Sequence, residues 1–204
     1  MNIRYYMAEF YGTFVLTFLG VGIYYLSGDI LTVGITVGIA YLIAAYTLDH
    51  ISHAHFNPLM TLAAYIDQRM SVKTFGIYLV AQVSGALFGY VSLLLFNIQP
   101  FFSRPLDYAF TDFGILAFVS FILVYVYLAV SEQPKKRPFL GLSVGLSYAV
   151  LTIFTINTTF GVLSPLRLFE MTEVMPMLVS TAGLMLGSLL AAGFYAQLKF
   201  NPVP

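Results

Sequence analysis

Six long apolar stretches, separated by short polar segments, dominate the pattern of the chain. Their bounds are Tyr5–Leu26, Ile30–Leu48, Ser71–Phe96, Phe113–Val130, Phe139–Ile156 and Pro176–Phe200. Each stretch is close to the ~20 apolar residues that a helix needs to cross the hydrocarbon core of a bilayer. The pattern therefore predicts an all-α membrane protein with six transmembrane helices.

The second and fifth stretches are similar to each other. GITVGIAYLI (34–43) and GLSVGLSYAV (141–150) share two glycines, a valine and a tyrosine when Gly34 is aligned with Gly141. This shift, here called the repeat offset, also carries Asn57-Pro58-Leu59 onto Ser164-Pro165-Leu166. We interpret the chain as a single transmembrane domain, 1–204, built from two halves of about 1–100 and 101–204. Because each half has three spans, the halves enter the membrane in opposite senses and form an inverted repeat.

Each half carries a Pro-containing segment between its second and third spans. The segment is too short to cross the membrane, so it should enter and leave on the same side. Non-helical backbone at this depth is tolerated only where it is buried in protein or lines a water-filled cavity. Asn57 and Ser164 are good N-cap residues, and Pro58 and Pro165 suit the first helical position. We therefore expect two re-entrant half-helices whose positively polarised N-termini face each other and offer N–H donors to a neutral solute.

Composition and charge agree with a membrane protein. Of the 204 residues, 59% are hydrophobic and 9% charged, whereas soluble domains carry roughly 25% charged residues. Nine basic and nine acidic residues balance, so charge gives no reason to expect nucleic-acid binding. Without cysteine the chain has no disulfide and no thiolate metal site. Placing both termini in the cytoplasm puts most Lys and Arg there, which predicts a multi-pass plasma-membrane protein in that orientation.

Four segments resemble the aquaporin, or major intrinsic protein, family. They are AEFYGTF (8–14), SHAHFNPLMTLA (52–63), QVSGALFGY (82–90) and SPLR (164–167). The resemblance covers nearly the whole chain, and it implies passive passage of water and small neutral solutes across the bilayer. It also implies a homotetramer with one pore per subunit, no cofactor and no enzymatic turnover. The family usually repeats Asn-Pro-Ala, whereas this chain has Asn-Pro-Leu and Ser-Pro-Leu.

The resemblance also assigns functional positions. It gives a pore motif (Asn57, Pro58, Leu59, Ser164, Pro165, Leu166), a selectivity filter (Val37, Thr152, Gly161, Arg167), a cytoplasmic mouth (His53, His55), loop support by Glu9, and no metal. Arg167 is a charge at membrane depth, which is functional by default. Val, Thr and Gly leave a wide, partly apolar ring with Arg167 as its main donor. This ring is similar to that of plant members that pass boric or silicic acid, whereas glycerol facilitators usually place Asp where Leu168 stands.

Three departures from the family leave questions for the structure. Ser164 brings one hydroxyl donor where an amide would bring two. Leu59 and Leu166 add bulk near the expected meeting of the half-helices, and they either push the halves apart or narrow the lumen. The repeat partner of Glu9 is Leu116, so the second re-entrant segment needs another acceptor for its backbone N–H groups.

Three histidines lie close together in the sequence and allow more than one interpretation. His50, His53 and His55 fall within six residues and suit either a divalent metal or a pH sensor. The simpler interpretation, favoured because no fourth ligand is near, is that the histidines bond loop carbonyls and line the pore.

The rival functions are a strictly water-selective channel, a cation-leaky channel, and an ion-coupled transporter, which would also use broken helices. No nucleophile triad, metal quartet or phosphate-binding loop suggests an enzyme.

Overall fold

The computed structural model describes residues 3–100, 110–159, 163–171 and 173–200, and all regular structure within them is helical. The elements are α1 Ile3–Ser27, α2 Ile30–Ser52, α3 Pro58–Ile66, α4 Val72–Leu93, η1 Leu94–Phe96, α5 Phe110–Ser131, η2 Arg137–Phe139, α6 Leu140–Thr159, η3 Pro165–Glu170 and α7 Val174–Phe200. Six of the helices are long and apolar enough to span a membrane. The six predicted spans are therefore confirmed, with ends that shift by a few residues.

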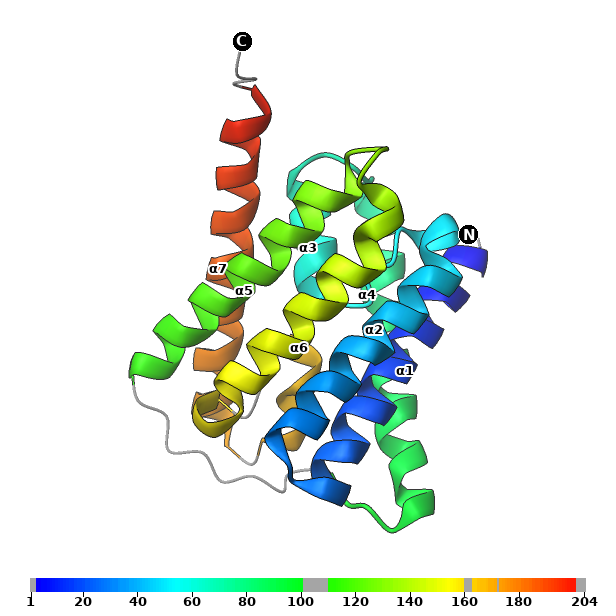
Figure 1. Ribbon diagram of the computed structural model, residues 1–204, viewed down its shortest axis with the longest axis vertical. Coiled ribbons are helices and arrows are strands. Elements are labelled where there is room, and N and C mark those ends of the chain that lie inside the picture. Colours follow the sequence, from blue (N-terminus) through cyan, green and yellow to red (C-terminus); the bar gives the residue numbers. More distant parts are fainter. Residues whose placement is uncertain (1–2, 101–109, 160–162, 172, 201–204) are drawn as a thin grey trace.

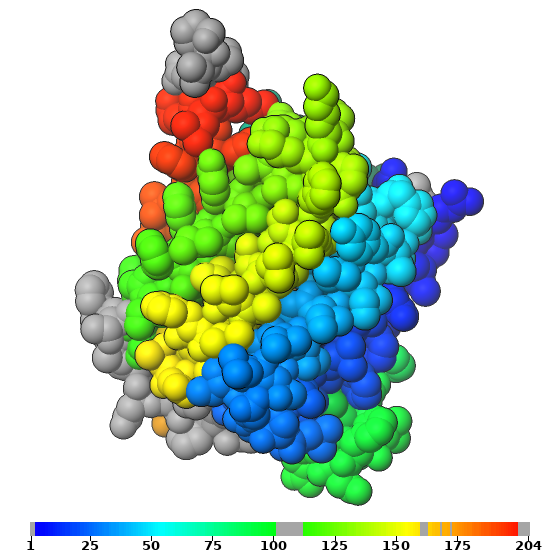
Figure 2. Space-filling model, in the orientation of Figure 1, coloured from blue at the N-terminus to red at the C-terminus, as the bar shows by residue number. Residues whose placement is uncertain are grey.

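The long helices lie side by side as a tilted bundle, with the short α3 enclosed among them (Figure 1). Helix α1 packs on α4, α5 packs on α7, and α2 packs on α6. The pair α2 and α6 forms one continuous face of the molecule (Figure 2). Helix α1 begins and α7 ends at the same end of the bundle, as an even number of spans requires.

The crossing of α2 and α6 shows the predicted symmetry of the two halves. A Cβ atom on Gly38 would lie 2.6 Å from the carbonyl oxygen of Gly145, and one on Gly145 would lie 2.7 Å from that of Gly38. These two glycines are partners at the repeat offset. Their reciprocal contact places the pseudo-two-fold axis of the inverted repeat between them, where only small residues allow the backbones to meet.

The last helix departs from the register of the repeat. In the first half Gly85 of α4 packs against the carbonyl of Phe10, and in the second half Gly187 of α7 packs against that of Ala117. Phe10 and Ala117 are partners at the repeat offset, whereas that offset would carry Gly85 onto Ala192. The same packing thus recurs in both halves although the sequence register shifts before α7.

Candidate functional site

The first re-entrant segment, between the end of α2 and the start of α3, has an irregular backbone that hydroxyl groups stabilise. His53, Ala54 and Phe56 have φ values of 64°, 51° and 50°, which residues other than glycine adopt uncommonly. Four hydroxyls donate to its carbonyls: Tyr78 to Ser52 (2.9 Å), Tyr127 to His53 (3.2 Å), Tyr41 to Ala54 (2.7 Å) and Thr13 to Phe56 (3.3 Å). These bonds replace the water that backbone carbonyls lack at membrane depth. Sequence analysis missed the three tyrosines, whose signal is a hydroxyl-bearing residue inside a predicted span.

Glu9 supplies the acceptors for the N–H groups of the same segment. Its side chain is completely buried. Oε1 accepts from the backbone N of His55 (3.1 Å) and from Oγ of Ser52 (2.6 Å). Oε2 accepts from the backbone N of Phe56 (2.8 Å) and from Nε2 of Gln82 (2.7 Å). One carboxylate thus satisfies four donors that have no access to water.

Asn57 begins α3 and also joins the two re-entrant segments. Its Oδ1 accepts from the backbone N of Leu59 at 3.0 Å, and Pro58 occupies the first helical position. Its Nδ2 donates to the hydroxyl of Tyr148 (2.7 Å) and to the carbonyl of Leu163 (2.9 Å). In this structure protein groups accept both hydrogens of the amide.

The second re-entrant segment differs from the expected α-helical half-helix. η3 is a six-residue 3-10 helix, in which Arg167 N donates to the carbonyl of Ser164 at 3.1 Å. The Ser164 hydroxyl accepts from Leu166 N at 3.3 Å, so Ser164 does act as an N-cap ahead of Pro165. Side chains three residues apart are eclipsed in a 3-10 helix, and this geometry places Arg167 directly beside Glu170.

Arg167 is paired with a buried carboxylate. Nε lies 2.8 Å from Oε1 of Glu170, and Nη2 lies 3.0 Å from Oε2. Glu170 is 2% exposed, and the hydroxyl of Tyr90 lies 3.0 Å from its Oε1 and 3.3 Å from the carbonyl of Leu166. Sequence analysis missed Glu170. The side chains of Arg167 and Tyr90 donate to it, and Leu116, the repeat partner of Glu9, is buried in the core.

Three of the four predicted filter residues line one cavity of about 60 Å³, here called the Arg167 cavity. They are Val37, Thr152 and Arg167; Gly161 lies outside the described residues. Ser164 and Leu166 also line it, together with Thr13, Leu16, Thr17, Gly20, Val21, Phe56, Tyr148 and Leu163. Thr152 is 1% exposed and its hydroxyl has no hydrogen-bond partner in the described structure. A buried, unsatisfied hydroxyl on a cavity wall is suited to bind a polar solute.

A second cavity of about 510 Å³, here called the His55 cavity, lies at the end of the bundle where α2 ends. His53 and His55 line it with Arg69, Tyr127 and Arg137. Nδ1 of His55 lies 3.1 Å from the hydroxyl of Thr61, between the rings of Tyr78 and Tyr127. The two cavities share no lining residue.

His53 makes a different contact from His55. Arg137 donates from Nη2 to Nδ1 of His53 and is itself bound to the carboxylate of Asp49. Burial, and next the positive charge of Arg137, lower the pKa of His53 below its usual value. His50 lines a separate surface pocket. Within the described ranges no group of three or more His, Cys, Asp or Glu side chains is placed to hold a metal ion.

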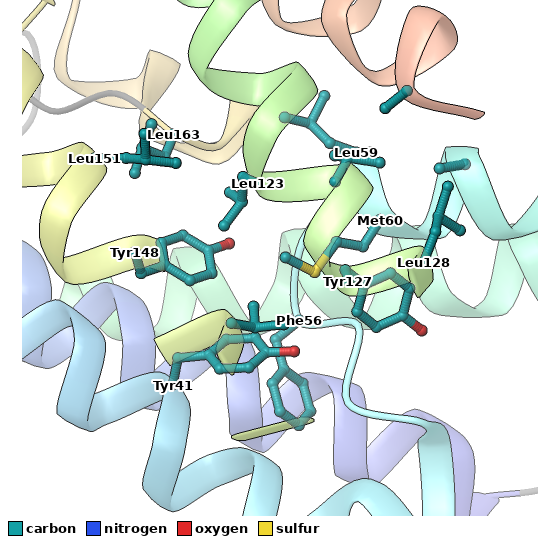
Figure 3. Close-up of a cluster of buried hydrophobic side chains, with 14 of the residues drawn as sticks. Tyr41, Phe56, Leu59, Met60, Leu123, Tyr127, Leu128, Tyr148, Leu151 and Leu163 are labelled. Atoms are coloured by element: carbon teal, nitrogen blue, oxygen red, sulfur yellow. The ribbon is translucent and has the colours of Figure 1, made fainter. Parts of the chain in front are cut away.

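The two motif leucines have different places. Leu59 is 1% exposed and packs in the buried cluster of Figure 3, away from both cavities. Its carbonyl accepts from the hydroxyl of Ser188 on α7 at 2.8 Å. Leu166 lines the Arg167 cavity. Leu59 therefore fills the core, and Leu166 narrows the cavity.

Comparisons with known proteins agree with this arrangement. The family model for "Major intrinsic protein" matches residues 1–195. The "Glycerol uptake facilitator protein-like 6" of Lactiplantibacillus plantarum is 33% identical over 174 residues, which cover 80% of this chain and 81% of that protein. "Aquaporin Z" of Rhodopseudomonas palustris is 28% identical over 82% of this chain and 79% of its own length. "Aquaporin NIP1-2" of Oryza sativa subsp. japonica is 30% identical over 79% of this chain, but the match spans 59% of that longer protein.

A solved structure gives the same fold. The aquaglyceroporin from Plasmodium falciparum superposes with a TM-score of 0.71 at 21% sequence identity, covering 98% of this chain and 97% of that one. The six spans and the two re-entrant segments therefore form an aquaporin-like fold. With the family model matched over nearly its whole length, the chain belongs to the major intrinsic protein family, the family of the aquaporins.

Proposed function

We propose that the protein is a passive, bidirectional membrane channel for water and small neutral solutes. The observation that carries this proposal is the meeting of the two re-entrant segments at the Asn57–Leu163 hydrogen bond. A cavity with polar groups in its wall lies on each side of that meeting point, lined by Arg167 on one side and by His55 on the other. Such an arrangement selects by width, by donors in the wall and by electrostatic barriers.

Val37, Thr152, Gly161 and Arg167 form the proposed selectivity filter. Val37 and Thr152 bring small side chains to the cavity wall beside Arg167, so a solute larger than water has room there. Thr152 offers a hydroxyl without a hydrogen-bond partner in the described structure, and Arg167 brings a charged guanidinium to the same wall. The relative from L. plantarum is named a glycerol uptake facilitator, which supports small polyols as substrates. Urea and metalloid hydroxy acids have similar size and hydrogen-bonding groups.

Cation leakage is the second candidate property, and the Arg167–Glu170 ion pair favours it. The positive charge that should repel cations lies within 3.0 Å of a carboxylate, so its field at the cavity is reduced. A strictly water-selective channel and an ion-coupled transporter remain as rival outcomes of the same measurement.

Reconstituted liposomes test the proposed function. Stopped-flow shrinkage and swelling should show faster passage of water, glycerol, urea and boric acid than empty liposomes show. Val37→Phe should slow glycerol more than water, because the ring fills the cavity wall. Ile39→Phe is the matched control, since Ile39 is exposed on α2. Water flux with no solute flux would support the water-selective rival, and flux that requires an ion gradient would support the transporter.

The same proposal includes the assembly and location of the chain. We place it in the plasma membrane as a homotetramer of single-domain subunits, with both termini in the cytoplasm and no enzymatic turnover. Helices α2 and α6 carry exposed apolar side chains such as Ile35, Ile43 and Phe154. Such a surface suits contact with lipid or a neighbouring subunit. Native mass spectrometry in detergent tests the oligomer, and protease accessibility of tags at each terminus tests the orientation.

A further inference from the structure

Three aromatic rings lie between the two cavities. Phe56 and Tyr148 line the Arg167 cavity, and Tyr41 lines neither cavity. The ring of Tyr41 lies 5.2 Å from that of Tyr148 and 5.9 Å from that of Phe56, measured between centroids. All three side chains are at most 4% exposed and lie together in the buried cluster (Figure 3). The Tyr41 hydroxyl also bonds Ala54, which lies between His53 and His55 of the His55 cavity. The three rings therefore connect the wall of the Arg167 cavity to the segment that lines the His55 cavity.

The two tyrosines are equivalent positions of the inverted repeat. The repeat offset carries Tyr41 onto Tyr148, and each is one helical turn from a predicted filter residue: Tyr41 follows Val37 by four residues and Tyr148 precedes Thr152 by four. Because the repeat axis passes between α2 and α6 close by, the two rings approach each other from opposite halves. Their contact is a consequence of the fold's symmetry and does not depend on loop positions.

Hydrogen bonds hold both rings in place. The Tyr41 hydroxyl donates to the carbonyl of Ala54 at 2.7 Å, and the Tyr148 hydroxyl accepts from Nδ2 of Asn57 at 2.7 Å. Each tyrosine is thus anchored to the first re-entrant segment. The hydroxyl proton of Tyr148 has no acceptor within the part of the chain that the structure describes. Since Tyr148 lines the Arg167 cavity, a solute there can accept this proton.

We propose that Tyr41 and Tyr148, with Phe56 packed against them, form a second constriction that determines which neutral solutes pass. This inference rests on the proposed channel function and deepens it. The ring of Val37, Thr152, Gly161 and Arg167 admits and orients a solute, and the tyrosine pair sets the upper size limit. The hydroxyls of Tyr148 and Thr152 provide consecutive donors on one wall, so hydroxyl-bearing solutes cross in preference to apolar molecules of equal size.

The test compares the two constrictions with solutes of increasing length. Liposomes carrying the full chain are assayed by stopped-flow with water, urea, glycerol, erythritol and xylitol. Tyr41→Val and Tyr148→Val, singly and together, should raise erythritol flux relative to water flux by roughly tenfold, the change for a barrier lowered by about 1.4 kcal/mol. Val37→Ala should raise this ratio less than the tyrosine variants do, and Thr152→Ala should lower it because a donor is lost. Ile39→Ala, at an exposed position of α2, should leave the ratio unchanged.

Matched substitutions separate the ring from the hydroxyl. Tyr41→Phe and Tyr148→Phe retain the rings and should retain the size limit, while Tyr148→Phe should slow polyols more than water because one donor is lost. If the valine variants do not insert into the liposome membrane, Tyr41→Leu and Tyr148→Leu replace them. Leucine has a side-chain volume between those of tyrosine and valine, so the same flux ratio can be compared. An unchanged erythritol-to-water ratio in the folded double variant would overturn the proposal. So would a size limit that moves with Val37 and Thr152 instead.

The design distinguishes failure of this inference from failure of the proposed function. Water flux above that of empty liposomes, measured on the original chain, tests whether the protein is a channel at all. The ratio between solutes, measured across variants, tests only where the size limit lies. A chain that conducts water and whose limit does not respond to the tyrosines is a channel without this constriction.

Discussion

Arg167 donates to both carboxylate oxygens of Glu170, from Nε to Oε1 at 2.8 Å and from Nη2 to Oε2 at 3.0 Å. Both residues belong to the 3-10 helix η3, and Glu170 is almost fully buried. Breaking a buried ion pair by removing one partner is costly because the remaining charge is left uncompensated. The ion pair therefore stabilises η3. It also reduces the positive electrostatic potential that Arg167 produces in the Arg167 cavity.

Glu170→Gln should strengthen cation exclusion. The amide oxygen still accepts one hydrogen bond from Arg167 but no longer compensates its charge, so the net field at the cavity becomes more positive. The measurement is potassium and proton leak in liposomes, followed with a potential-sensitive and a pH-sensitive dye. Glu173→Gln is the control, since Glu173 is an exposed carboxylate nearby. Equal leak in both variants would show that the ion pair does not affect permeation.

Arg167→Val should raise cation leak and destabilise the protein. It leaves the Glu170 carboxylate buried without its partner, which costs about 3–5 kcal/mol of unfolding free energy. The double variant Arg167→Val with Glu170→Leu should recover much of this loss, because an apolar pair of suitable volume needs no compensation. Denaturant titration in detergent micelles gives the stability. A double variant as unstable as Arg167→Val alone would contradict the account.

Local sequence signals are sufficient for the architecture. The length and spacing of the apolar stretches predict all six spans, and the repeat offset predicts that the crossing at Gly38 and Gly145 lies within an inverted repeat. The cap at Asn57 with Pro58 is a signal carried by adjacent residues, so it too is predictable from the sequence.

Contacts that depend on tertiary geometry are not predictable in this way. Arg167 meets Glu170 only because η3 is a 3-10 helix, in which residues three apart are eclipsed; the sequence there equally suits an α-helix. The count of hydrophobic residues in a span includes tyrosine. This count hides the hydroxyls of Tyr41, Tyr78 and Tyr127, which donate to carbonyls of the first re-entrant segment. Their acceptors lie on another element and become known only from the fold.

Asn57 should contribute more to stability than an ordinary helix cap. Asn57→Ala removes a cap worth about 0.5–2 kcal/mol and leaves the Leu163 carbonyl without its donor, at a further cost of about 1–3 kcal/mol. Asn57→Ser keeps a neutral cap but loses the amide donor, so its loss of stability should lie between those of the original chain and the alanine variant. Ser71→Ala is the control, because Ser71 caps the N-terminus of α4 in an exposed position. Denaturant titration measures the unfolding free energy of each variant. If Asn57→Ala and Ser71→Ala lower it equally, the hydrogen bond between the two re-entrant segments does not contribute to stability.

The last prediction concerns pH and His53, which follows α2 at the His55 cavity. Burial and the charges of Arg137 and Arg69 lower the pKa of this histidine, while Asp49 acts in the opposite direction. The folded protein therefore disfavours the protonated ring. In the unfolded chain the same ring takes up a proton at about pH 6.5. The stability contributed by neutral His53 is present above that pH and is lost as the pH falls below it.

His53→Gln should flatten this pH dependence, because glutamine retains a hydrogen-bond acceptor for Arg137 and does not titrate. The apparent melting temperature of the original chain should fall between pH values of about 7 and 5, and that of the variant should fall less. His50→Gln provides the comparison, since His50 is an exposed histidine on the same helix end. If His50→Gln removes the pH dependence and His53→Gln does not, the titrating group is not the histidine beside Arg137.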